Sequence, residues 1–153
     1  MATAQQEISE LKDAAPAVVA VHAAGNRCVV VSWKADGESL IDLSQHLARF
    51  AIFLPLSADD ALFAKVALGE WGWSIGWSEE MEISSDTLWR LALEQGAEWL
   101  RAWRRGHRLT QAAAARALGV SPRMWRYYEA GSHLLPKTVR LAALGLDAEQ
   151  RAA

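Results

Sequence analysis

The sequence contains one cysteine, and no apolar stretch approaches the roughly 18 residues that a membrane span requires. A single cysteine excludes an intramolecular disulfide and any zinc site built from several thiolates. The first residues include acidic side chains, whereas a secretory signal peptide begins with a basic region and continues with an apolar one. We therefore expect no membrane association and a location in the reducing cytoplasm.

Motifs of known catalytic and cofactor sites are also missing. The four histidines are scattered without metal-ligand spacing, and there is no HExxH, Gly-rich phosphate loop or nucleophile elbow. Cys28 precedes three valines and is interpreted as a small apolar strand residue, not as a nucleophile. Two carboxylate pairs, Asp59-Asp60 and Glu79-Glu80, are interpreted as solvated loop. The sequence predicts no enzyme, cofactor or metal site.

The charge is unevenly distributed along the chain. Residues 1–100 hold six Lys and Arg against fifteen Asp and Glu, a net charge of −9. Residues 101–140 hold nine Lys and Arg against Glu129 alone, a net charge of +8, whereas the whole chain has a formal charge of −2. The pattern predicts an acidic body joined to a basic piece.

The expected fold class is α+β, with a small antiparallel sheet domain and short helices followed by an all-α domain. We expect a flexible N-terminus over 1–16, an acidic domain over 17–95, a basic helical domain over 96–147 and a tail over 148–153. The acidic domain should contain a hairpin, a third strand, a helix beginning at Ser44, a second hairpin and a helix start at 84–86. The expected strands are 17–24, 27–34, 39–43, 63–68 and 74–77.

Eight tryptophans are many for a chain of this length, and five of them lie in the acidic part. A ligand cage or a platform for stacking bases is one interpretation, but such platforms combine aromatic with basic side chains. Trp77 and Trp89 instead flank acidic residues, which favours core packing or interface burial.

Residues 17–90 resemble the small domain-of-unknown-function family 2442. The resemblance is carried by VVVSWKADGESLIDL and by the closing stretch from Ile75-Gly76-Trp77 to Asp86-Thr87-Leu88-Trp89. It implies a compact α+β domain without established catalytic chemistry.

The basic part divides into four segments, each with the length of one short helix: 96–108, 110–119, 120–131 and 135–145. Thr110 is the expected N-cap of the second helix, and Gly119 its terminating glycine. Ser121 should cap the third helix, with Pro122 at its first position. The alanines before Gly119 are small enough for two helices to cross closely.

A helix over 122–130 would turn Trp125 and Tyr128 inward. Its outward residues would be Pro122, Arg123, Arg126 and Tyr127. Arginine is the side chain that reads guanine with two hydrogen bonds in the major groove, which admits such a helix.

Residues 97–146 resemble the lambda-repressor-like (XRE-type) helix-turn-helix family. The resemblance rests on Thr110-Gln111, the stretch ARALGVS at 115–121, Glu129-Ala130-Gly131 and Pro136. It implies that Gln111, Arg108 and Lys137 contact phosphates, that Arg123 and Tyr127 face bases, and that Arg126 touches either. Trp125 stands where the family has Ile or Val, and one helix follows Pro136 where many members have two.

These observations predict a transcriptional regulator that binds double-stranded DNA in a sequence-specific manner, as a homodimer, through helix 122–130. The alternative is an antitoxin-like or adaptor protein whose acidic domain binds a protein partner, with DNA binding secondary.

Overall fold

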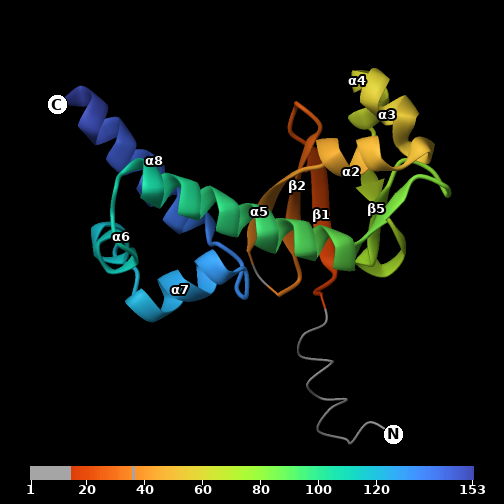
Figure 1. The fold of residues 1–153 in the computed structure, drawn as a ribbon. Helices are drawn as coiled ribbons and strands as arrows, with labels where there is room; N and C mark the ends of the chain where they lie inside the picture. The colour runs from red at the N-terminus through yellow and green to blue at the C-terminus, as the bar shows by residue number, and fades with distance from the viewer. Residues whose placement is uncertain (1–14, 36) are drawn as a thin grey trace, which may run out of the picture.

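The computed structural model describes residues 15–35 and 37–153. The predicted flexible segment 1–16 therefore lies outside the described residues except for Ala15 and Pro16. One long helix, α5 (Ser85–Gly106), runs through the molecule, with the β-strands beside one half and the remaining C-terminal helices beside the other (Figure 1). The sheets and the C-terminal helices are thus joined by a continuous helix.

The first sheet is an antiparallel meander of β1 (Val18–Ala23), β2 (Cys28–Trp33) and β3 (Glu38–Asp42), as the sequence predicts. Alternate residues of β2 face inward, and Val29, Val31 and Trp33 are buried. The turn between β1 and β2 places Asn26 in the left-handed region at φ 51°. This alternation explains why a valine-rich segment forms a strand with one face in the core.

Short helices follow the first sheet: α2 (Ser44–Arg49), η1 (Ala51–Phe53), α3 (Leu54–Ala58) and α4 (Asp60–Phe63). The prediction that Ser44 is an N-cap was wrong, because Ser44 is the first helical residue. Its backbone N–H donates to the Asp42 carboxylate at 2.9 Å. Asp42 therefore takes over the capping of the free N–H.

The second sheet consists of β4 (Ala67–Leu68), β5 (Ser74–Gly76) and β6 (Glu82–Ser84), with η2 (Glu70–Gly72) between β4 and β5. The predicted strand 63–68 is shorter than expected, since Phe63 ends α4 and only Ala67 and Leu68 pair with β5. Phe63 is buried in the core beside Trp77, whose indole N–H donates to the Phe63 carbonyl at 2.8 Å.

The tryptophans of this part have different environments. Trp33 is buried, packs edge-on against Trp89 with 4.9 Å between ring centroids, and donates to the Ser39 hydroxyl. Trp71 and Trp73 are 82% and 57% exposed. The prediction of core packing thus holds for Trp33, but not for Trp71 and Trp73 at the end of η2.

The boundary expected at residue 95 falls inside α5, and the separate helix expected over 96–108 is its C-terminal half. Ser84 caps α5, as the 84–86 signal predicts, by accepting from the Thr87 N–H at 3.2 Å. One hydrophobic cluster contains the sheets and the first part of α5 as far as Ala92, and a second begins at Leu100. Two cores share one helix.

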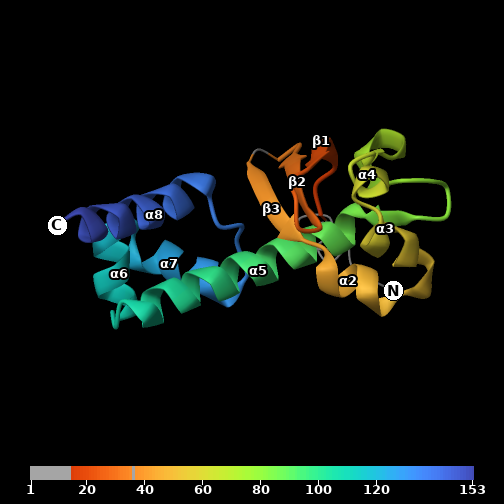
Figure 2. The ribbon, with the colours of Figure 1, turned by 90° about the horizontal axis from the view of Figure 1, so that it is seen from above.

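The second cluster is formed by the end of α5 with α6 (Gln111–Leu118), α7 (Pro122–Ala130) and α8 (Lys137–Ala152), which we call the helical unit. Figure 2 shows α8 and β3 on the same side of α5. The segment 148–153, expected to be a tail, continues α8 as far as Ala152. Among the described residues, no helix combines the length and hydrophobicity that a membrane crossing needs.

Candidate nucleic-acid interface

The turn between α6 and α7 is defined by capping residues. The Thr110 hydroxyl accepts from the Ala113 N–H at 3.1 Å, and the Ser121 hydroxyl accepts from the Met124 N–H at 3.1 Å. Gly119 adopts φ 72° at the C-terminal end of α6, a conformation that costs glycine little. The caps predicted from the sequence are confirmed.

Small side chains allow α6 to pack closely in the helical unit. Ala114, Ala115 and Trp125 are fully buried in one cluster, and the Trp125 ring lies 6.3 Å from that of Trp103 on α5. Tyr128 is also buried, so both aromatic residues predicted for the inner face of α7 lie there. Of the residues expected outside, Pro122, Arg123 and Arg126 are exposed, whereas Tyr127 is half-buried.

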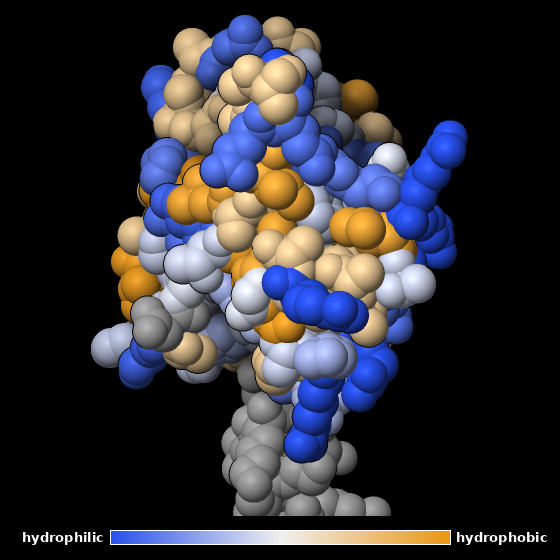
Figure 3. Space-filling model, turned by 90° about the vertical axis from the view of Figure 1, so that its left-hand side faces the viewer, coloured by the Kyte–Doolittle hydropathy of each residue, from blue (hydrophilic) through white to orange (hydrophobic). Residues whose placement is uncertain are grey.

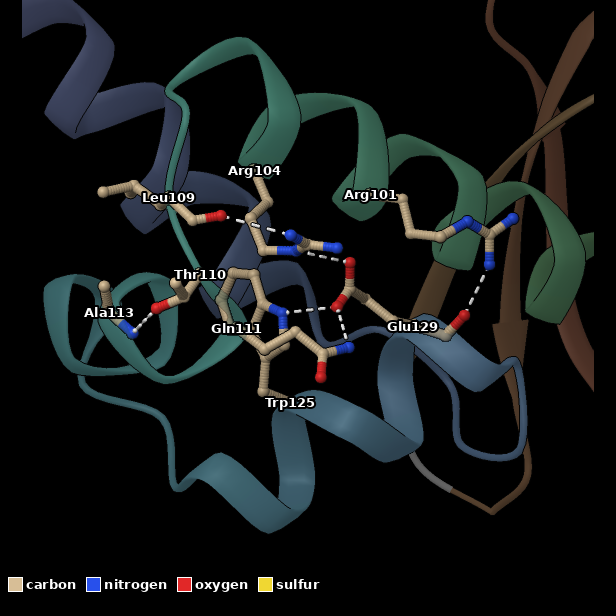
Figure 4. A network of polar contacts seen from close by, with 8 residues as sticks. All are labelled: Arg101, Arg104, Leu109, Thr110, Gln111, Ala113, Trp125 and Glu129. Atoms are coloured by element: carbon tan, nitrogen blue, oxygen red, sulfur yellow. Dashed lines mark hydrogen bonds and ion pairs between the residues drawn. The ribbon is translucent and has the colours of Figure 1, made fainter.

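A buried carboxylate connects three helices of this unit (Figure 4). Glu129 on α7 is 4% exposed. Its carboxylate accepts from Arg104 Nε on α5 at 2.8 Å, from Gln111 Nε2 on α6 at 2.6 Å and from Trp125 Nε1 at 2.9 Å. A buried charge is tolerated when it is paired and hydrogen-bonded, and both conditions hold here.

From the sequence, Glu129 enters only as part of the stretch Glu129-Ala130-Gly131, although it is the single acid among residues 101–140. Its spacing from Trp125 indicates a contact between the two side chains, because residues four positions apart in a helix lie one turn from each other. Arg101 completes the connection by donating to the Glu129 backbone carbonyl. Arg101 and Arg104 are thereby directed inward, and the only negative charge of this stretch is removed from the surface.

Gln111, predicted to bind a phosphate, is half-buried and donates to Glu129. A side-chain amide nitrogen carries two N–H groups, and Glu129 accepts from one of them. The contact between Gln111 and a phosphate stays a prediction, which would use the other N–H group. The structure adds a role in joining α6 to α7, which the sequence did not indicate.

Five arginines of the helical unit are exposed, and no acidic residue lies between positions 101 and 140 to accompany them except the buried Glu129. They are Arg105, Arg108, Arg116, Arg123 and Arg126. Figure 3 views this end of the molecule and shows strongly hydrophilic residues projecting from its lower part and right side. Pro122 is also exposed, at the N-terminal end of α7. The surface of α7 therefore offers positive charge and N–H donors.

Lys137, also predicted to contact a phosphate, is exposed at the start of α8 but pairs with Glu38 of β3 at 3.1 Å. The next turn of α8 carries Arg140, whose guanidinium lies 4.4 Å from the ring centroid of Trp99. Burial lowers the pKa of Arg140. Both cations line the groove between β3 and α8, where Lys137 has Glu38 as its partner.

Tyr127, predicted to face bases, is half-buried and contacts two other side chains at the surface of α7. Its ring stacks on His133, and its hydroxyl accepts from Arg123. Arg126 has no hydrogen bond, ion pair or ring contact with the part of the chain that the structure describes. Within residues 15–35 and 37–153, no cluster of three or more His, Cys, Asp or Glu side chains could hold a metal ion.

No protein-family model and no curated protein matches the sequence, so the two family resemblances stay predictions. A solved structure does match: the crystal structure of a putative DNA binding protein from Nitrosomonas europaea. The two sequences are 30% identical, the match covers 87% of each chain, and the TM-score is 0.49.

Proposed function

We propose that this chain binds double-stranded DNA through its helical unit. The chain belongs to the same family as the Nitrosomonas europaea protein, to which it is 30% identical over 87% of both chains. The observation that carries the proposal is the exposure of five arginines on a unit whose only acid between residues 101 and 140 is buried. Exposed guanidinium groups suit a polyanion, because phosphate contacts release condensed counterions and so favour binding.

The proposed mode is that of a helix-turn-helix, with α7 as the recognition helix in the major groove. Pro122, Arg123 and Arg126 occupy the exposed side of the first two turns of α7. The major groove is about 12 Å wide and admits an α-helix. Arg108 lies outside α7, before the start of α6, and is assigned to the phosphate backbone.

A single helical unit offers few contacts, so we propose that the protein acts as a homodimer and regulates transcription. Two-fold symmetric helix-turn-helix proteins bind half-sites about 34 Å apart. The corresponding test is the selection of bound duplexes from a random pool, which should return an inverted repeat with about one helical turn between half-site centres.

The test of DNA binding itself is the salt dependence of affinity for the selected duplex. With about six phosphate contacts, affinity should fall roughly 10³-fold between 50 and 200 mM salt. Arg126→Ala should weaken binding, whereas Arg90→Ala, which removes an exposed arginine from the other end of α5, should leave it unchanged. A salt-insensitive complex, or equal effects of the two substitutions, would contradict the proposal.

A second candidate function is that of an adaptor whose acidic part binds another protein. It is favoured by the exposed Trp71 and Trp73, which border a groove with Val19 and Lys34, because exposed tryptophans are enriched in protein interfaces. Purification from the host distinguishes the two functions. A stoichiometric protein partner lost on Trp71→Ala favours the adaptor, and enriched duplex fragments lost on Arg126→Ala favour the DNA-binding protein.

A further inference from the structure

The two exposed arginines of α7 have different surroundings. Arg123 donates from Nε to the Tyr127 hydroxyl at 2.9 Å, and its Cζ lies 5.5 Å from the centroid of the Tyr127 ring. The spacing of four residues places both side chains on one face of the helix, one turn apart. Arg126 has no comparable contact with the described part of the chain. One guanidinium is therefore oriented by the protein, and the other is not.

Tyr127 is itself held in place by the segment that follows α7. The ring of His133 stacks on that of Tyr127, with 4.7 Å between centroids and 15° between planes. Ser132 anchors this segment, because its backbone N–H and its hydroxyl both donate to the Tyr127 carbonyl at 3.1 Å. The phenol oxygen that receives Arg123 is thus positioned by a packed ring and a hydrogen-bonded turn.

The hydrogen bond determines which edge of the guanidinium is available. A guanidinium has five N–H groups in a planar fork. With Nε occupied by Tyr127, the end of the fork, formed by Nη1 and Nη2, remains for a ligand. Guanine presents two adjacent acceptors, O6 and N7, in the major groove, and the arginine fork matches them with two hydrogen bonds.

Orientation in the free protein also reduces the side-chain entropy that is lost on binding. Arg126, which lacks such support, suits a phosphate, because an isolated oxyanion accepts hydrogen bonds from a wider range of directions than a base edge. The two arginines of α7 thus differ in how far the protein orients them before a ligand binds.

We propose that Arg123 determines specificity by reading one guanine end-on through Nη1 and Nη2, and that Tyr127 is its positioning residue. Arg126 contacts the phosphate backbone. The proposal rests on the proposed function, since it requires α7 to lie in the major groove of duplex DNA.

The experiment compares the selected duplex with duplexes in which each guanine is replaced in turn by 7-deazaguanine, which lacks the N7 acceptor. Wild-type protein should lose about 5- to 10-fold in affinity at one guanine of each half-site, the size expected for part of a bidentate pair. Arg123→Ala should bind both duplexes equally. Tyr127→Phe should show a smaller loss at that same guanine while the salt dependence of binding stays unchanged, because no phosphate contact is removed.

Two further variants exclude a merely structural effect. Tyr128→Phe alters the adjacent tyrosine, which is buried in the second hydrophobic cluster, and should retain the full discrimination. Arg126→Ala should weaken both duplexes alike and reduce the salt dependence by about one phosphate contact.

The outcomes separate this inference from the function on which it rests. Absence of salt-dependent binding to any duplex removes the proposed function. Salt-dependent binding with equal discrimination by wild type and Tyr127→Phe, or discrimination lost in Arg126→Ala and kept in Arg123→Ala, overturns the inference and leaves DNA binding intact.

Discussion

Arg104 on α5 and Glu129 on α7 form an ion pair of 2.8 Å inside the helical unit, with 17% and 3% of their side chains exposed. The Glu129 carboxylate also accepts hydrogen bonds from Gln111 and Trp125. This arrangement fixes α7 relative to α5 and α6. The proposed recognition helix is therefore held in place by an ion pair on its buried side.

Glu129→Ala should destabilise the protein by about 3–5 kcal/mol, because it leaves the Arg104 charge buried without its partner. Chemical denaturation measures the change. Glu94→Ala removes the acid of an exposed pair with Arg90 on α5 and should cost at most about 1 kcal/mol. Equal costs for the two substitutions would show that the buried pair contributes no more than a surface pair.

Two glycines should respond with opposite sign to the same substitution. A Cβ at Gly119 or at Gly145 would meet no atom within 4 Å, so packing does not distinguish them. Gly119 has φ 72°, and Gly119→Ala should cost about 1 kcal/mol. Gly145 lies inside α8, where alanine should stabilise the protein by about 0.5–1 kcal/mol. Thermal unfolding of both variants tests this, and destabilisation by both would contradict it.

Glu38 competes with DNA for Lys137 if the predicted phosphate contact of Lys137 exists. Glu38→Gln should then raise affinity and steepen the salt dependence by about one phosphate contact, since the ammonium no longer has to leave a carboxylate. Glu94→Gln removes the same charge farther from Lys137 and serves as the control. An identical salt dependence in both variants would exclude Lys137 from the interface.

The protein should become less stable in mild acid, in part through His46. Burial lowers the pKa of His46, and the positive charges of Arg90 and Arg49 lower it further. Because the folded-state pKa lies below the unfolded value of about 6.5, the unfolded state gains the proton first as the pH falls. The free energy of unfolding of His46→Gln, measured with urea, should therefore rise relative to that of the wild type as the pH is lowered from 7.5 to 5.5. A stability difference that does not change with pH would contradict this.

Short stretches of neighbouring residues are sufficient to predict part of the fold. The β1–β2 hairpin follows from valine-rich strands and a Gly25-Asn26 turn, and the α6–α7 connection follows from Thr110, Gly119 and Ser121. Each of these features depends on backbone geometry and on hydrogen bonds within about four residues, so the sequence contains the required information locally.

Long-range partners were not accessible in the same way. Gln111 is predicted to contact a phosphate, and its hydrogen bond to Glu129 forms only when α6 and α7 pack together. The predicted boundary at residue 95 falls within α5, because a change of composition along the chain does not by itself interrupt a helix. Lys137 is predicted to contact a phosphate, whereas its ion-pair partner Glu38 lies 99 residues earlier in the chain.

The sequence by itself determined the charge separation between the two parts of the chain, the caps of α6 and α7, and which face of α7 is apolar, because these are properties of composition and helical spacing. Only the tertiary structure decided which charges remain free. It places Glu129 in the interior with Arg104, pairs Lys137 with Glu38, and orients Arg123 on Tyr127. The physical reason is that a side chain's charge is encoded by its identity, whereas its partner and its exposure depend on which distant elements pack against it.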